Sequence, residues 1–240
     1  MRTLCLDLGN TRKKYAVFEG SEPVKSDAIE GDLKEGILTL LEQYKPEKSI
    51  LSSVIHHDEE IESILAEKSR FHKLTSKSNL NFRSVVPKPE TVGADRLAIC
   101  AAAVDRYPGT NVLAVGLGTC ITYNFVNKFG EFLGGGISPG MDMRFRSLEE
   151  LTAYLPLIRE NWNFPLVGYD TETNILSGVI LGMAKEIDGF IEEYAAKYVN
   201  FNVLLTGGNS AYFVPHLKKK QIFADLNLIF KGLYAISECN

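Results

Sequence analysis

The N-terminal stretch LCLDLGNTRKKYAVF, residues 4–18, places an acid and a glycine where an apolar strand turns back. Gly9 allows a close backbone approach to a ligand or a positive φ, and Asn10 and Thr11 carry short polar groups that suit phosphate oxygens. At that place Asp7 would lie close to a bound phosphate, and the two negative charges would repel each other unless a cation lay between them. Its carboxylate suits Mg²⁺, which prefers oxygen ligands. A plain hairpin turn, in which glycine and asparagine are also common, is the alternative.

A similar bend recurs in NVLAVGLGTCITYNFV, residues 111–126, where an apolar strand, a Leu-Gly-Thr bend and a second strand follow one another. Gly9 and Gly118 are 109 residues apart in a chain of 240. Two such bends facing each other would hold a polyphosphate from both sides, and Lys13 or Lys14 could add a positive charge. The repeat predicts two similar halves, with coincidence as the alternative.

The sequence Gly93-Ala94-Asp95-Arg96 places a carboxylate beside a guanidinium at the start of a predicted helix. Asp95 could accept a proton from a substrate hydroxyl, which makes an alcohol a better nucleophile toward a phosphate. Arg96 could bind a substrate carboxylate or phosphate in a bidentate manner. A role in helix capping alone is the alternative for Asp95.

Alternating strands and helices must position these residues, and the pattern predicts an α/β layer fold with domains at residues 1–109 and 110–240. The three consecutive glycines from Gly134 to Gly136 predict a packed turn or a ligand wall outside a strand. We expect strands at 3–8, 14–18, 48–54, 70–75 and 202–206 and two more within 111–126, and helices at 32–44, 58–68, 94–106, 148–155, 177–198 and 224–237.

Composition excludes several classes of protein. The net charge is −4, which argues against a binder of nucleic acid, and the short basic run Lys218–Lys220 is predicted to be a solvated surface. No apolar run suits a membrane span or a secretory leader, so the cytoplasm is the expected location. The cysteines and histidines show no metal-binding spacing, and neither a nucleophile elbow nor a P-loop motif is present.

Taken together, the segments resemble type III pantothenate kinase, a family within the acetate and sugar kinase, Hsp70 and actin superfamily. Their order and spacing along the chain carry the resemblance more than any single motif does. The segments are DLGNT at 7–11, VGADRLA at 92–98, GTCITYNFV at 118–126, GGGISPGMDMRFRSL at 134–148, TAYLP at 152–156, YDTETNILSG at 169–178 and LTGGNS at 205–210.

The resemblance implies two ribonuclease-H-like halves of the actin-like ATPase kind, with mixed sheets flanked by helices and a nucleotide cleft between them. It also implies ATP-dependent phosphorylation of pantothenate to 4'-phosphopantothenate, the first step of coenzyme A biosynthesis. The implied cofactors are ATP with Mg²⁺ and a monovalent cation, K⁺ or NH₄⁺. The implied assembly is a homodimer with composite sites.

By position, the resemblance makes Asp95 the general base and Asp7 the residue that holds Mg²⁺ with ATP. The residues that would bind the nucleotide are Asp7, Leu8, Gly9, Asn10, Thr11, Arg12, Lys13, Lys14, Gly118, Thr119, Gly207 and Gly208. The residues that would line the pantothenate site are Val86, Gly93, Ala94, Asp95 and Arg96, together with Thr171 from the neighbouring subunit.

The chain departs from the family pattern at three positions. Gly116 stands where a carboxylate usually holds the monovalent cation, Asn124 replaces a second acid, and Val86 falls near the usual tyrosine of the substrate site. Weaker cation binding and reduced cation dependence are therefore expected. A nucleotide-binding regulator with weak catalysis and a sugar kinase of the same superfamily are the alternative functions.

Overall fold

The computed structural model of the chain describes residues 1–218 and 222–240. Contacts divide the chain into two compact units, Met1–Val112 with Asn124–Gly134 and Asn227–Asn240, and Leu113–Tyr123 with Gly135–Leu226. The predicted halves 1–109 and 110–240 stay a prediction. Within the predicted solvated run, Lys219 and Lys220 lie outside the described residues.

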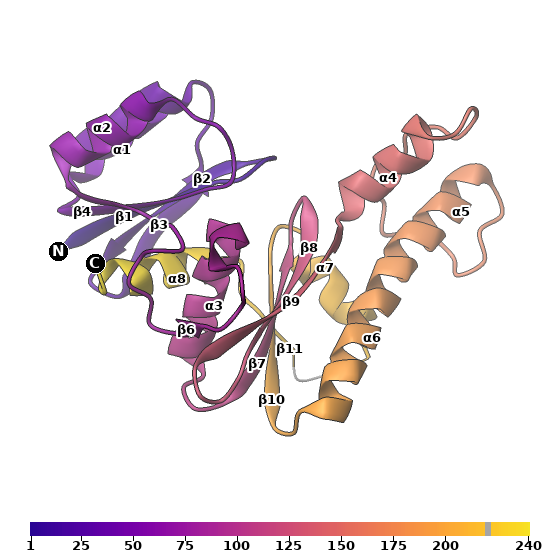
Figure 1. Cartoon of the computed structure of the whole chain (residues 1–240). Helices are drawn as coiled ribbons and strands as arrows, with labels where there is room; N and C mark the ends of the chain where they lie inside the picture. The colour runs from indigo at the N-terminus through magenta and orange to yellow at the C-terminus, as the bar shows by residue number, and fades with distance from the viewer. Residues whose placement is uncertain (219–221) are drawn as a thin grey trace. The chain divides into compact units, whose positions relative to one another are not determined.

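The order of elements is that of an α/β protein with two sheets (Figure 1). In chain order they are β1 (Arg2–Leu8), β2 (Lys13–Glu19), β3 (Glu22–Ala28), α1 (Leu33–Tyr44), β4 (Lys48–Ser53), α2 (Glu59–Lys68), β5 (Arg70–Lys73), β6 (Arg83–Ser84), η1 (Pro89–Thr91), α3 (Ala94–Arg106), β7 (Asn111–Leu117), β8 (Cys120–Val126), β9 (Glu131–Pro139), α4 (Met141–Glu150), α5 (Thr171–Leu176), η2 (Ser177–Leu181), α6 (Gly182–Lys197), β10 (Phe201–Thr206), α7 (Ser210–Phe213), η3 (Val214–His216), β11 (Ile222–Ala224) and α8 (Leu228–Ser237).

The first sheet has the strand order β3-β2-β1-β4-β5, antiparallel from β3 to β1 and parallel from β1 to β5. Because side chains alternate along a strand, Leu4, Leu6 and Leu8 all lie on one face of β1. There they pack with buried residues of α1 and α2, such as Ile37 and Ile61. The first turns of both helices follow from aspartate N-caps.

The opposite face of this sheet packs against α3 and α8. Cys5 and Ile50 of the sheet join Ala98 of α3 and Leu233 of α8 in one buried cluster. Gly232 lies so close to the Ala98 carbonyl that a side chain would collide with it. Close approach of small residues therefore holds α8 against the helix that carries Asp95.

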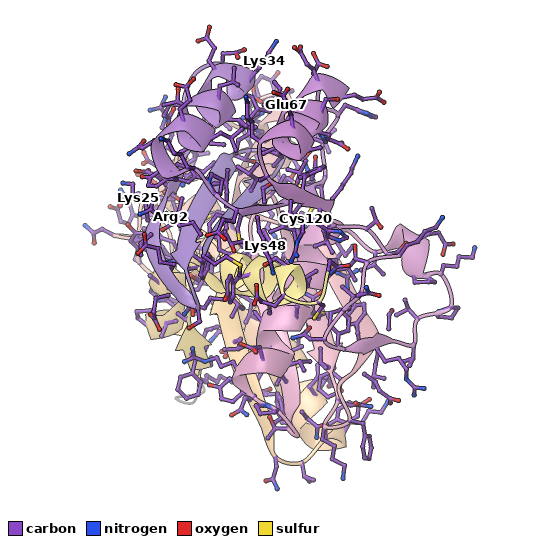
Figure 2. All side chains as sticks on the ribbon, turned by 90° about the vertical axis from the view of Figure 1, so that its left-hand side faces the viewer. Arg2, Lys25, Lys34, Lys48, Glu67 and Cys120 are labelled. Carbon is purple, nitrogen blue, oxygen red and sulfur yellow. The ribbon has the colours of Figure 1, made fainter. Side chains whose placement is uncertain are left out.

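A buried lysine ties α8 to the sheet as well (Figure 2). Lys48 on β4 donates to the backbone carbonyl of Ser237 at 3.2 Å and forms an ion pair with Glu238 at 2.8 Å. The charge of a buried lysine requires such partners. The C-terminal helix is thereby fixed to the strand next to β1.

The second sheet has the strand order β11-β10-β7-β8-β9-β6. Read from the other edge, β9-β8-β7-β10-β11 repeats the first sheet's order β3-β2-β1-β4-β5, with β6 added beyond β9. The bends after β1 and β7 thus occupy equivalent places, as the sequence repeat predicts. The fold class is confirmed as α/β with two mixed sheets flanked by helices.

Two predicted placements of elements around the glycine-rich stretch are wrong, because the glycines were expected outside a strand and the next helix was expected later in the chain. The three glycines lie within β9, where Gly134 has φ +103° and Gly136 faces the ring of Tyr123. A Cβ on Gly136 would be 3.3 Å from that ring, which itself stacks on Phe190 at a centroid distance of 3.9 Å. Gly136 therefore leaves room for the stacked rings of Tyr123 and Phe190 against β9.

The predicted helix at 148–155 is also misplaced, because α4 runs from Met141 to Glu150. Gly140 caps it directly after β9, and Met141 and Phe145 are its two buried residues. Two buried positions are too few to give a clear helical periodicity. Leu151 and Tyr154, which the prediction placed in the helix, are 82% and 96% exposed.

The last two helices differ from their predicted ranges at their N-termini. Helical structure begins at Thr171 rather than 177, because Asp170 and Thr173 form a capping box. It continues through the π-turn η2 into α6. The final helix begins at Leu228 instead of 224, since residues Ile222–Ala224 pair with β10 as β11. Of the helices described, none has the length and apolar character to cross a membrane.

Candidate active site

Asp7 lies near the end of β1, on the face that packs against α3 and α8. It is directly opposite Lys14 on β2 and Ser52 on β4. Residues directly opposite one another point to the same face of a sheet, so Lys14 shares the face of Asp7, whereas Lys13 is opposite the buried Leu8. The Ser52 hydroxyl donates to Asp7 Oδ1 at 3.3 Å. The structure thus selects Lys14 as the lysine on the face of Asp7.

Asp95 is the second residue of α3, and the N-cap position belongs to Gly93. The carboxylate folds back over the start of the helix, because Asp95 Oδ1 lies 2.5 Å from the point that a Cβ on Gly93 would occupy. A side chain at residue 93 would displace the carboxylate. Gly93 is therefore needed for the position of Asp95, and the role of Asp95 is not that of an N-cap.

The carboxylates of Asp7 and Asp95 lie close enough to interact. Burial, followed by the charge of Asp95, raises the pKa of Asp7 from 3.8 to about 6, while Lys14 and the Ser52 hydroxyl oppose the rise. Burial also raises the pKa of Asp95, and this is opposed by backbone N–H groups and by the charge of Arg96. Two partly buried acids within electrostatic range of each other favour a cation nearby.

Arg96 is half-buried beside this pair. Its Nε donates to Asn124 Oδ1 at 2.7 Å, and its guanidinium carbon lies 5.6 Å from the centroid of the Phe132 ring. Asn124 therefore contacts the residue expected to bind the acceptor, although the resemblance connected this position with the monovalent cation. Val86, another expected substrate residue, packs partly buried against the same core cluster.

Two predicted site residues can act only through their backbones. The side chain of Leu8 is fully buried among α1 and α2, and its carbonyl accepts from Val54 N–H at 3.1 Å. The side chain of Ala94 is 9% exposed and belongs to the core between the first sheet, α3 and α8.

The first bend is exposed at Asn10, Thr11 and Arg12. The Gly9 N–H donates to the carbonyl of Arg12 at 3.1 Å, so that amide is used within the turn. A Cβ on Gly9 would lie 3.1 Å from the same carbonyl, which is tighter than usual. The turn itself thus accounts for the glycine at position 9.

The second bend is enclosed by two further glycines. The Gly118 N–H donates to the carbonyl of Cys120 at 3.1 Å. A side chain on Gly140 would collide with the carbonyls of Gly118 and Thr119, and one on Gly207 would collide with the backbone of Leu117. The structure therefore brings Gly118, Thr119 and Gly207 together, with the exposed Gly208 next in sequence.

Gly140 was not among the predicted site residues. Contacts from α4 hold the backbone next to it in place. Arg144 on α4 donates from Nε to the carbonyl of Pro139 at 2.9 Å, and also pairs with Glu186 on α6. Tyr123 donates to the same Glu186 at 2.9 Å. A sequence signal existed in the Pro139-Gly140 pair directly before a helix, but it did not reveal which backbone the glycine approaches.

The remaining predicted residues lie on separate elements. Gly116 is buried within β7, and Thr171 is exposed at the first position of α5. Over residues 1–218 and 222–240, no group of three or more His, Cys, Asp or Glu side chains lies together as a metal site. Mg²⁺ in phosphate-transfer sites commonly uses one or two carboxylates and the phosphates themselves, which Asp7 could satisfy.

The raised pKa of Asp7 predicts a stability effect. The folded protein binds this proton more tightly than the unfolded chain, so the stabilisation is present below about pH 4 and is lost as the pH rises through about 6. Asp7→Asn should remove this loss, and raise the free energy of unfolding at pH 7.5 by roughly 1 to 3 kcal/mol relative to wild type. Urea unfolding at pH 4 and pH 7.5, without Mg²⁺ or nucleotide, measures the difference.

Asp27→Asn is the control for that experiment, because a hydrogen bond from Lys25 lowers the pKa of Asp27. It should give no gain in stability at pH 7.5. Equal pH dependence of unfolding in wild type and Asp7→Asn would contradict the burial and charge coupling described for Asp7.

Solved structures share the fold over nearly the whole chain. A protein described as a Baf family transcriptional activator from Campylobacter jejuni matches with a TM-score of 0.62 and 19% identity, covering 98% of this chain and 97% of that one. A glucokinase from an Antarctic psychrotroph matches with a TM-score of 0.53 and 8% identity, covering 100% and 99%. At these identities the likeness concerns the fold alone.

Sequence comparison identifies the family. The Type III pantothenate kinase from Christiangramia forsetii is 39% identical over 239 residues, covering 99% of this chain and 98% of that protein. The family model described as Type III pantothenate kinase matches residues 3–193. With the acid pair beside the first bend and the repeated strand order on which both bends depend, the chain belongs to the type III pantothenate kinase family.

Proposed function

We propose that this chain transfers the γ-phosphoryl group of ATP to the primary hydroxyl of pantothenate, the first step of coenzyme A biosynthesis. The observation that carries the proposal is the interacting pair Asp7, near the end of the central strand β1, and Asp95, in the first turn of α3. One carboxylate suits a nucleotide-bound cation, and the other suits an alcohol. Phosphoryl transfer needs this positioning and charge stabilisation more than covalent chemistry.

The two bends are proposed to hold the phosphates of ATP. At the first bend the contacts would come from Asn10, Thr11 and Arg12, because the Gly9 amide is already used in the turn. At the second bend the Gly118 amide is likewise used within the turn, so Gly118 would serve by allowing a phosphate close to the backbone and Thr119 would make the contact. Gly207 and Gly208 would lie toward the nucleoside. Lys14, on the face of Asp7, adds a positive charge.

Asp7 fits Mg²⁺ bound with ATP, because burial and the neighbouring Asp95 leave it with an unfavourable negative charge. A divalent ion there would neutralise phosphate charge, the chemistry it supplies in such enzymes. The chain's own contribution is to hold the carboxylate at the end of β1, with the Ser52 hydroxyl fixing one oxygen. Lys14 balances part of the remaining charge.

Asp95 is proposed as the general base that takes the proton from the pantothenate hydroxyl. Its pKa is raised by burial, which brings a carboxylate closer to the working range of a base near neutral pH. Arg96 would bind the carboxylate of pantothenate. Gly93 leaves room for the base, while Val86 and the backbone of Ala94 would line the site.

Thr171 is proposed to complete the site of a second copy in a homodimer. The segment before it exposes large apolar side chains: Tyr154, Leu166, Val167 and Tyr169 are between 78% and 96% exposed. Apolar side chains exposed at this density are typical of a protein interface. The capping box of α5 would hold Thr171 at the edge of that surface.

The proposed location is the cytoplasm, where buried cysteines such as Cys5 and Cys100 remain unpaired. Neither nucleic acid nor membrane is proposed as a partner. A weakly catalytic regulator is not favoured, because relatives at 36–39% identity are named kinases and Asp95 is present beside Arg96. Sugars remain the acceptors to exclude, because the fold is shared with a glucokinase.

Asp95→Asn should lower kcat by about 10² to 10⁴ with pantothenate, because the proton acceptor is lost. The variant should be at least as stable as wild type, since burial disfavours the charge of Asp95. ADP release with pantothenate, and separately with several sugars, measures both the role and the substrate. Full activity of the variant, or turnover with sugars alone, would contradict the proposal.

Gly118→Ala should raise KM for ATP by about tenfold or more without a change in Tm. A Cβ at Gly118 would meet only the Cys120 carbonyl at 3.9 Å, so the fold itself does not require glycine there. A phosphate held close to the backbone would require it. Gly189→Ala, at an open position in α6, is the control and should leave KM unchanged. An unchanged KM in Gly118→Ala would place the phosphates elsewhere.

We expect the turnover rate to depend less on a monovalent cation, because Gly116 in β7 supplies no carboxylate to bind it. Turnover measured against KCl, at constant ionic strength with a bulky ammonium salt, should change little or saturate only at high concentration. Half-saturation by K⁺ or NH₄⁺ in the millimolar range would show that other groups hold the cation and that Gly116 has no such consequence.

A further inference from the structure

The position of Arg96 is not explained by the stability of its helix. It is the third residue of α3, near the positive end of the helix dipole, where a cation is unfavourable. Its side chain is also half-buried, which adds a desolvation cost. A charged group held at such a cost requires contacts that fix it.

Two of these contacts come from the β8–β9 hairpin. Asn124 on β8 accepts a hydrogen bond from Arg96 Nε at 2.7 Å, and Phe132 on β9 lies with its ring centre 5.6 Å from the guanidinium carbon. The side chains of Asn124 and Phe132 are fully buried. Phe132 is itself held edge-on by Phe82 at a centroid distance of 6.4 Å.

The two contacts restrain different parts of the Arg96 guanidinium. The amide oxygen of Asn124 meets the edge of the guanidinium at the nitrogen nearest the aliphatic stem, and the Phe132 ring meets its carbon. Because the guanidinium is planar and rigid, fixing Nε fixes the direction of the whole fork. The hydrogen bond comes from a rigid strand, so its direction is defined more sharply than one from a loop would be.

We infer that Asn124 is a positioning residue for the acceptor: through the Arg96 Nε hydrogen bond, it aims the guanidinium at the carboxylate of the substrate. The inference rests on the proposed function. The essential property is an oxygen acceptor on β8, because either an amide or a carboxylate oxygen can receive the Nε–H bond. Asn124 would therefore determine affinity for an acidic acceptor without touching it.

A purely structural role makes a different prediction. If Asn124 only satisfied buried polar groups, its loss would lower stability and affect all substrates alike. If it aims Arg96, its loss should act on acceptors that carry a carboxylate. A neutral analogue of pantothenate, with the carboxylate replaced by a hydroxymethyl group, separates these roles.

The experiment compares Asn124→Leu and Asn124→Asp with wild type in the full-length chain. Asn124→Leu should raise KM for pantothenate by about 10- to 100-fold, the range for a lost hydrogen bond to a charged group, with kcat within about threefold. KM for the neutral analogue should change less than about threefold. Asn124→Asp retains the acceptor and should keep KM for pantothenate within about threefold of wild type.

Two further variants keep the result interpretable. In an Arg96→Ala background, Asn124→Leu should add no further loss in kcat/KM, because the two residues act as a unit. Asn111→Asp keeps the acceptor for Lys128 N–H at another strand end and controls for an added charge. If Asn124→Leu does not fold, Asn124→Ala, which also lacks an acceptor, takes its place, with thermal unfolding as the check.

Equal loss of affinity for pantothenate and for the neutral analogue in Asn124→Leu, or additive losses in the double variant, would overturn the inference. Wild-type turnover of pantothenate in the same assay shows that the proposed function stands independently of that result. A wild-type protein that neither binds nor phosphorylates pantothenate would overturn the proposed function, and the inference with it.

Discussion

The site depends on two partly buried carboxylates, Asp7 and Asp95, that lie near enough for the charge of Asp95 to raise the pKa of Asp7. Burial penalises the charge of both Asp7 and Asp95, and the charge of Asp95 makes Asp7 harder still to ionise. The surrounding protein only partly compensates, through Lys14, Ser52, Arg96 and backbone N–H groups. Such an arrangement lowers the stability of the protein alone. It is useful where a cation and a substrate hydroxyl complete it.

Much of the first unit serves to place this pair. Alternation along β1 puts three leucines on the side of α1 and α2, and therefore puts Asp7 on the side of α3. Close packing of Gly232 on Ala98 holds α3 against α8, and Lys48 ties α8 to the sheet. Packing of α3 against α8 and the sheet thus fixes the helix start that carries Asp95.

The second unit repeats the strand order but fixes its bend by different means. At the first bend, the glycine is accounted for by the turn. At the second bend, Gly140 and Gly207 allow two other backbone segments to approach, while Gly118 itself has space around it. A glycine that the fold does not require is the clearest indication of a ligand at this bend.

The sequence was sufficient for the elements with strong periodicity and clear boundaries. The helix from Ala94 to Arg106 was predicted with its observed bounds, since Gly93 precedes it and Pro108 follows it. The same reasoning misplaced α4, whose two buried residues leave almost no pattern. It also placed the three glycines of β9 outside a strand, as a packed turn or a ligand wall. Gly136 leaves room for the stacked rings of Tyr123 and Phe190, a contact between distant residues that local sequence does not reveal.

Within the site, the types of chemistry could be predicted but the partnerships could not. The carboxylates of Asp7 and Asp95 and the guanidinium of Arg96 could be identified from local sequence. The contact of Arg96 with Asn124 joins residues 28 apart, and depends on how the β8–β9 hairpin packs on α3. The choice of Lys14 over Lys13 likewise depends on the register between β1 and β2.

The most direct test of this account is a carbon-13 NMR titration of the two carboxyl groups, assigned with the single asparagine variants. The account predicts that Asp7 titrates with a pKa of about 6 in the free protein, and that its pKa falls when residue 95 becomes asparagine or when Mg²⁺ and ATP are added. Titration of both groups near pH 4, unaffected by either change, would show that the carboxylates neither are buried nor interact, and would contradict the account.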